Sequence, residues 1–164
     1  MVPGPPFLLS LGDHSASISS TTLDTTSSLF HVDSASTAHM EPEISRFSHY
    51  TLLHEPIRVT LADNHVVLAP GWGTVDLMLR DGTSLTRRSF EFLHIPDLRC
   101  TLISVSMLAS SHIAFMTNSQ GGRLHLDDGA GAWLATISVH RGLYLLDASY
   151  ATLPVAAAIS CPLT

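Results

Sequence analysis

One carboxylate in this sequence lies where chemistry could be built on it. The apolar alternation of residues 29–32 ends at Asp33, and the five residues that follow are all small. This pattern predicts a strand that stops at a tight turn, with Asp33 on the turn. Small side chains let a second backbone or a substrate come close, and the hydroxyls of Ser34 and Thr37 can hydrogen-bond the loop into one shape. The simpler alternative is that Asp33 and Ser34 form an Asx turn or cap a short helix.

The other residue types that carry chemistry do not form a recognisable site. The ten histidines include no helical H-x-x-x-H pair and no flanking cysteine pair, so we interpret them as strand and loop histidines that face solvent, and we predict no metal site. Gly71-Trp72-Gly73 lacks the third glycine of a dinucleotide loop, and no G-x-S-x-G element is present. Cys100 and Cys161 are interpreted as a buried thiol and a tail thiol. We therefore expect no cofactor.

The composition favours one domain with two tails. A chain of 164 residues is long enough for one core. The Ser/Thr-rich residues 1–28 are predicted to be a disordered linker, residues 29–147 the folded domain, and residues 148–164 an unstructured tail.

The charge and hydropathy of the chain limit its partners and its location. Only 13% of residues are charged and the formal net charge is -6, which disfavours direct binding of nucleic acid. No apolar run is long enough for a membrane span, and the first residues lack a signal peptide pattern. We expect an intracellular, cytoplasmic location, with the nucleus as the alternative.

Short strands must position the Asp33 turn. Residues 57–61 and 66–68 alternate around Asp63-Asn64 and predict a hairpin, while Pro70-Gly71 predicts a bend before the strand of residues 75–79. Asp81-Gly82 predicts a second hairpin, and further strands are expected up to Leu146. Three-residue spacing predicts one short helix over residues 102–109. The fold class is therefore all-β, a small barrel or sandwich with a single helix.

Three stretches carry a family resemblance. Residues 30–40 resemble the W-x-x-D-S-G-A-T-x-H-M element of the retropepsin-like domain in copia-type retrotransposon Pol polyproteins. Residues 59–64 are similar to the family's V-x-L-A-D-G hairpin, and residues 94–108 are similar to V-P-x-L-x-x-N-L-I-S-V-x-x-L. The first stretch keeps Asp33, Ser34, Thr37, His39 and Met40, and it departs at Phe30, Ala35 and Ser36.

The resemblance implies a retropepsin-like closed β-barrel and an aspartic endopeptidase that cleaves its own polyprotein. This chemistry needs two carboxylates about 3 Å apart that share one proton. The chain has no second turn of this kind, so the resemblance implies a homodimer in which Asp33 is supplied twice as the catalytic residue. The implied active-site loop is Ser34, Ala35, Ser36 and Thr37, with Ser34 bonding across the dimer axis. The implied flap is Ala62, Asp63 and Asn64, and the supporting helix is residues 102–108.

Ala35 leaves a second reading open. Glycine at this position tolerates any backbone angles, whereas alanine adds a methyl group where two loops would crowd, and a positive φ there would be strained. The alternative to a working protease is a catalytically inactive relic or domesticated β-barrel that acts as a structural or peptide-binding module.

Overall fold

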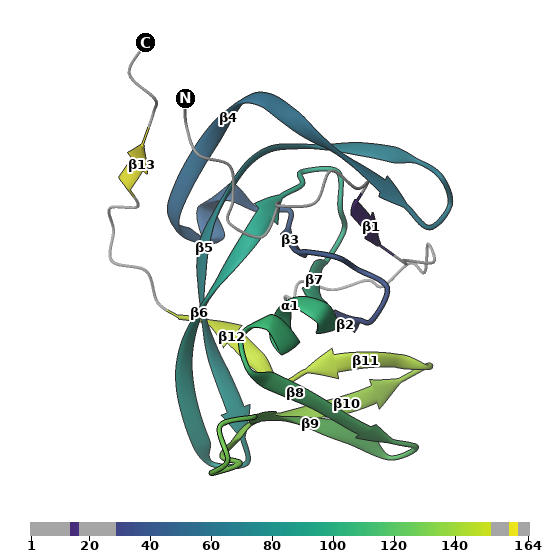
Figure 1. The fold of residues 1–164 in the computed structure, drawn as a ribbon, viewed down its shortest axis with the longest axis vertical. Helices are drawn as coiled ribbons and strands as arrows, with labels where there is room; N and C mark the ends of the chain where they lie inside the picture. Colours follow the sequence, from purple (N-terminus) through teal and green to yellow (C-terminus); the bar gives the residue numbers. More distant parts are fainter. Residues whose placement is uncertain (1–13, 17–28, 152–157, 161–164) are drawn as a thin grey trace.

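The structure is a computed structural model, and it describes residues 14–16, 29–151 and 158–160. These residues are mostly β-strand, with one short α-helix and one short 3-10 helix (Figure 1). The all-β class with a single short α-helix is thereby confirmed. The elements are, in chain order, β1 (His14–Ala16), β2 (Phe30–Asp33), β3 (His39–Glu41), η1 (Ile44–Arg46), β4 (Phe47–Leu61), β5 (Val66–Asp81), β6 (Ser84–His94), β7 (Thr101–Ser104), α1 (Val105–Ser110), β8 (Ile113–Asn118), β9 (Gly121–Leu126), β10 (Trp133–His140), β11 (Leu143–Leu146), β12 (Ala148–Tyr150) and β13 (Ala158–Ser160).

The strands form one curved sheet whose hydrogen-bonded path stays open. Its order is β1-β4-β5-β6-β3-β7-β2-β11-β10-β9-β8, with β12 paired to β5 and β13 paired to β4. A barrel closes only when its two edge strands pair. Within the described residues no ladder joins β8 to β1 or β4, so the prediction of a closed barrel is wrong. The outer edge of β4 is instead paired with β1 and β13.

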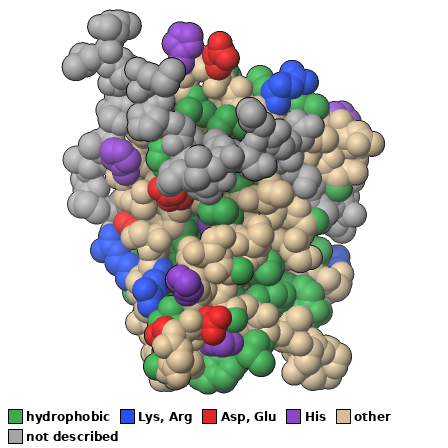
Figure 2. Space-filling view, viewed as in Figure 1, with side chains coloured by type: hydrophobic (Ala, Val, Ile, Leu, Met, Phe, Trp, Pro, Cys, Tyr) green, Lys and Arg blue, Asp and Glu red, His purple; other side chains and the backbone are tan. Residues whose placement is uncertain are grey.

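The sheet is arranged around the long β4–β5 hairpin and a smaller group of strands. Figure 1 shows this hairpin arching over one end of the molecule, with β8, β9, β10 and β11 at the other end and α1 between them. Charged side chains are few on the face drawn in Figure 2, and they do not merge into one large basic surface.

Strand β5 continues without a break through Pro70-Gly71, where its register with β4 shifts between Leu52 and Ile57. Two glycines in it meet the neighbouring strand at unusually short range. A Cβ on Gly71 would lie 2.2 Å from the hydroxyl oxygen of Tyr50, and a Cβ on Gly73 would lie 2.0 Å from the carbonyl oxygen of His49. The glycines therefore serve close packing of β4 against β5 and do not break the strand.

The core consists of two apolar clusters. The larger contains five aromatic side chains of β2, β4 and β6 together with aliphatic side chains of β5, β7 and the C-terminal strands: Phe30, Phe47, Tyr50, Phe90, Phe92, Val75, Leu77, Leu79, Ile103, Leu124 and Ile137. The smaller contains Ala38, Met40, Val59, Ala69, Leu93, Ile95, Leu98 and Leu102. Strand β7 contributes Ile103 to the larger cluster and Leu102 to the smaller, so the strand that pairs with β2 beside Asp33 is anchored in both.

The helix is shorter than predicted, because the residues predicted as its first turn belong to a strand. Residues 101–104 form β7, which is buried at all four positions between β2 and β3. Helix α1 begins at Val105, and the hydroxyl of Ser104 caps it by accepting the amide of Met107 at 3.2 Å. The predicted start at Leu102 is therefore wrong, since the apolar spacing there reflects a strand buried on both faces.

The tails contain more structure than the sequence predicted. Residues 14–16 form β1, so the predicted disorder of residues 1–28 fails there, while 1–13 and 17–28 lie outside the described residues. The prediction of an unstructured tail from residue 148 is wrong for β12 and β13, which pair with β5 and β4. The division of the chain at residues 28 and 147 stays a prediction.

Candidate active site

Asp33 lies at the carboxyl end of β2, as the sequence predicted. Parallel pairing of β2 with β7 puts it in register with Ser104. Its side chain is mostly buried, with 8% of the residue exposed, and its Oδ1 accepts the amide of Ala35 at 2.8 Å. This contact is the Asx turn that the sequence left as the simpler alternative. It fixes the orientation of the carboxylate relative to the loop.

The loop after Asp33 is tied to the start of α1. Ser36 is buried, and its hydroxyl donates to the carbonyl of Ala38 at 2.7 Å. The hydroxyl of Ser104 donates to the carbonyl of Ser36 at 2.6 Å while it caps α1. Ser34, Ala35 and Thr37 are exposed at the surface of the loop. The role of Ser104 in holding this loop was not predicted, because no local pattern around Asp33 reveals it.

His39 holds the other end of this loop. It is fully buried between the rings of Phe90 and Phe92, and its Nδ1 accepts the amide of Ser104 at 3.0 Å. Burial lowers the pKa of His39 to about 3, so the imidazole is neutral at ordinary pH. The interpretation of the histidines as solvent-facing is therefore wrong for His39, and also for His94, which is buried and hydrogen-bonded to Tyr50.

A second buried carboxylate, which the sequence analysis did not identify, lies on β3. Glu41 is fully buried, and its oxygens accept the amide of Glu43 at 2.9 Å, the hydroxyl of Thr101 at 2.9 Å and the hydroxyl of Tyr150 at 2.6 Å. Burial raises the pKa of Glu41, and the three hydrogen bonds and the charge of Arg46 oppose this rise. The sequence signal for Glu41 is weak, since it consists of a glutamate directly after the apolar Met40. The structure shows that all three residues of β3 are buried.

Glu41 is not the second member of a catalytic pair with Asp33. Asp33 is in register with Ser104, whereas Glu41 bonds Thr101, three residues earlier on β7. This offset corresponds to roughly 10 Å along a strand, far more than two carboxylates that share a proton allow. Both carboxylates act on Cys100, whose thiol pKa rises to about 11 through burial, the charge of Asp33 and the charge of Glu41. The thiol therefore stays protonated and is a poor nucleophile.

The raised pKa of Glu41 predicts the pH dependence of its stability contribution. A carboxyl whose pKa is higher in the folded than in the unfolded chain contributes most below the unfolded value and less as pH rises through the folded value. Glu41→Gln stays neutral and can still donate to the hydroxyl of Tyr150 or Thr101. The unfolding free energy of this variant minus that of the wild type should therefore increase as pH rises above the ordinary glutamate value of 4.5. Urea unfolding at several pH values measures this difference. The exposed Glu55→Gln is the matched control, and a Glu41→Gln difference that falls with rising pH would contradict the assignment.

The hairpin predicted as the flap is present. Strands β4 and β5 are joined by residues 62–65, where the amide of Leu61 donates to the carbonyl of His65 at 2.7 Å and Asn64 has a φ of 66°. Ala62, Asp63 and Asn64 are all exposed, and Asp63 accepts the amide of His65 at 3.0 Å. This hydrogen bond holds the pKa of Asp63 below its usual value. Closure of this hairpin over Asp33 stays a prediction.

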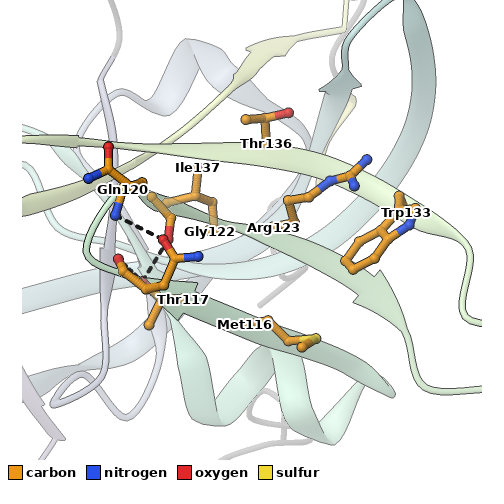
Figure 3. A pocket seen from close by; sticks show the side chains of 10 residues that line it. Met116, Thr117, Gln120, Gly122, Arg123, Trp133, Thr136 and Ile137 are labelled. Atoms are coloured by element: carbon orange, nitrogen blue, oxygen red, sulfur yellow. Dashed lines mark hydrogen bonds between the residues drawn. The ribbon is translucent and has the colours of Figure 1, made fainter.

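An open hollow lies elsewhere, on strands β8, β9 and β10. Figure 3 shows Met116, Thr136 and Trp133 around it, with Arg123 on the middle strand. The guanidinium of Arg123 lies 4.0 Å from the ring centroid of Trp133, and it pairs with Asp81. None of the described residues that line the hollow is an aspartate or a glutamate.

No helix among the described residues is long and apolar enough to cross a membrane. No group of three or more His, Cys, Asp or Glu side chains in the described ranges is arranged to hold a metal ion.

The comparisons place the chain in a family. Residues 30–113, about half of the chain, match the family model described as the Pol polyprotein beta-barrel domain. The chain therefore belongs to the family of Pol polyprotein beta-barrel domains. The match contains the Asp33 loop, the β4–β5 hairpin and α1. A significant match is found neither among curated proteins nor among solved structures.

Proposed function

We propose that this chain supplies one half of a retropepsin-like aspartic endopeptidase of the copia type, with Asp33 as its catalytic residue. The observation that carries the proposal is the placement of Asp33 at the end of β2, in a loop held at Ser36 by Ser104. Membership of the Pol polyprotein beta-barrel family supports it. Since the register sets Glu41 far from Asp33, the second carboxylate comes from a second copy of the chain.

The chemistry follows from two Asp33 side chains that share one proton. The ionised carboxylate removes a proton from water, whose oxygen attacks the peptide carbonyl carbon, and the protonated carboxyl donates its proton to the carbonyl oxygen. As the intermediate collapses, the C–N bond breaks and the carboxyl that took the proton from water donates it to the leaving nitrogen. The other carboxylate takes a proton from a hydroxyl of the intermediate, which restores the shared proton. No metal or cofactor takes part. The substrate is an extended segment of the polyprotein that contains the domain, in the cytoplasm or within a retroelement particle.

One observation favours the second candidate, an inactive peptide-binding module. The Oδ1 of Asp33 already accepts the amide of Ala35, a contact that a purely structural Asx turn would also make. Ala35 carries a methyl group where the family pattern has glycine. In this reading the β4–β5 hairpin and the Asp33 loop bind a peptide without cleaving it.

Asp33→Asn tests the proposal against this alternative. The assay measures cleavage of a peptide library between pH 3 and 8, with Ala35→Gly as the parent chain, and sedimentation measures the oligomeric state. We expect cleavage with an optimum in acid to mildly acidic conditions, and its loss in Asp33→Asn, because the shared proton no longer exists. Equal cleavage by parent and Asp33→Asn would show that Asp33 is not the catalytic group.

A further inference from the structure

The strand β12 brings Tyr150 against the strands that carry the Asp33 loop. It pairs with β5, with Tyr150 opposite Leu77. The Tyr150 ring lies 5.0 Å from the ring of Phe30 between centroids. Its hydroxyl donates to Glu41 at 2.6 Å and lies 2.8 Å from the hydroxyl of Thr101. One side chain therefore contacts β2, β3 and β7 together.

These three strands hold both ends of the Asp33 loop. Residues 34–38 lead from β2 to β3, and both strands pair with β7. At one end of β7, Ser104 bonds His39 and the carbonyl of Ser36. At the other end, Thr101 is in register with Phe30 and bonds Glu41. The contacts of Tyr150 hold β2, β3 and β7 together at this second end of β7.

We propose that Tyr150 is a positioning residue for Asp33, acting through Phe30 and the hydrogen bonds to Glu41 and Thr101. This inference rests on the proposed function, because it concerns where the two Asp33 carboxylates meet. Tyr150 lies outside residues 30–113, which match the family model. Its contacts with Phe30, Glu41 and Thr101 are therefore separate from the features that define the match. The catalytic loop thereby depends on a strand more than a hundred residues downstream.

Several charged or titratable groups surround the Tyr150 hydroxyl, and the test must leave them in place. Glu41 of β3 accepts a hydrogen bond from the Tyr150 hydroxyl, and the guanidinium of Arg46 in η1 lies 4.3 Å from the centroid of the Tyr150 ring. The thiol of Cys100, just before β7, is influenced by the charges of Glu41 and Asp33. Tyr150→Phe removes only the hydroxyl and keeps the ring contacts with Phe30 and Arg46.

The experiment compares Tyr150→Phe with its parent, the full chain carrying Ala35→Gly. We expect kcat to fall about tenfold, since misplacement by about 1 Å can cost a hundredfold. We also expect the basic limb of the pH profile to move to lower pH, because carboxylates that lie farther apart share a proton less strongly. A mere loss of folded protein would lower the rate by the same factor at every pH. Thr101→Val, which removes the other hydroxyl, should shift the limb in the same direction.

Tyr144→Phe is the matched control. The Tyr144 ring packs on Phe115 with centroids 5.5 Å apart, and its hydroxyl makes no hydrogen bond within the described part of the chain. We expect an unchanged pH profile for this variant. An unchanged profile in Tyr150→Phe, or an equal shift in Tyr144→Phe, would overturn the inference while Asp33-dependent cleavage persists. Loss of all Asp33-dependent cleavage in the parent would instead overturn the proposed function, and this inference with it.

Discussion

Ala35→Gly is expected to raise the rate of peptide cleavage by about a hundredfold over the chain as it stands. The methyl group of Ala35 is exposed at the tip of the loop, where a second loop would meet it in a dimer. Misplacement of reacting groups by about 1 Å can cost a factor of this size. Backbone strain is not the reason, because the described non-glycine residues with positive φ are Asn64, His112 and Arg141. The measurement is kcat/KM on library-derived peptides near the acidic optimum.

Ala38→Gly is the control for this prediction. Ala38 lies in the same loop, but its methyl group is fully buried in the smaller core cluster. Removing it loosens the loop and relieves no crowding, so it should not accelerate cleavage. If Ala35→Gly is folded and dimeric but still inert, this result would contradict the protease proposal and support the interpretation as a peptide-binding module.

Gly73→Ala is expected to destabilise the chain by about 3 kcal/mol or more. The new Cβ would lie 2.0 Å from the carbonyl oxygen of His49 and 2.9 Å from the Cα of Tyr50. Both atoms belong to the backbone of β4, so no side-chain rotation relieves the overlap and the two strands must separate. Urea unfolding followed by circular dichroism measures the loss.

Gly82→Ala distinguishes this steric effect from a general intolerance of alanine. Gly82 has a φ of 59°, and apart from its two chain neighbours no residue has an atom within 4 Å of its added Cβ. Only the backbone penalty of the left-handed region remains, so the expected cost is about 1 kcal/mol. Equal losses in the two variants would show that close packing of β4 on β5 is not the constraint at Gly73.

The sequence by itself determined most of the strands between residues 57 and 146, several turns and the position of the candidate carboxylate. Period-two alternation predicts strands because successive side chains point to opposite faces of a sheet, and Asp81-Gly82 predicts its hairpin because Gly82 adopts a positive φ. Asp33 was found because an apolar run ended at a carboxylate followed by small residues. The coarse family assignment was also readable, from three short stretches in order.

Only the tertiary structure decided how these pieces are joined. Residues 102–104 were predicted as the start of a helix, yet they belong to strand β7, because burial between β2 and β3 determines their conformation. The open path of the sheet depends on which segments pair with the outer edge of β4, and local periodicity does not encode such pairing.

The polar contacts around the candidate site depend on the tertiary structure for the same reason. His39 meets Ser104 across 65 positions of the chain, and Tyr150 meets Glu41 across 109. Such contacts leave no periodic trace near either residue, because they arise only when distant strands lie side by side. The sequence therefore located the carboxylate of Asp33, and the packing of β2, β3, β7 and β12 decided how it is held.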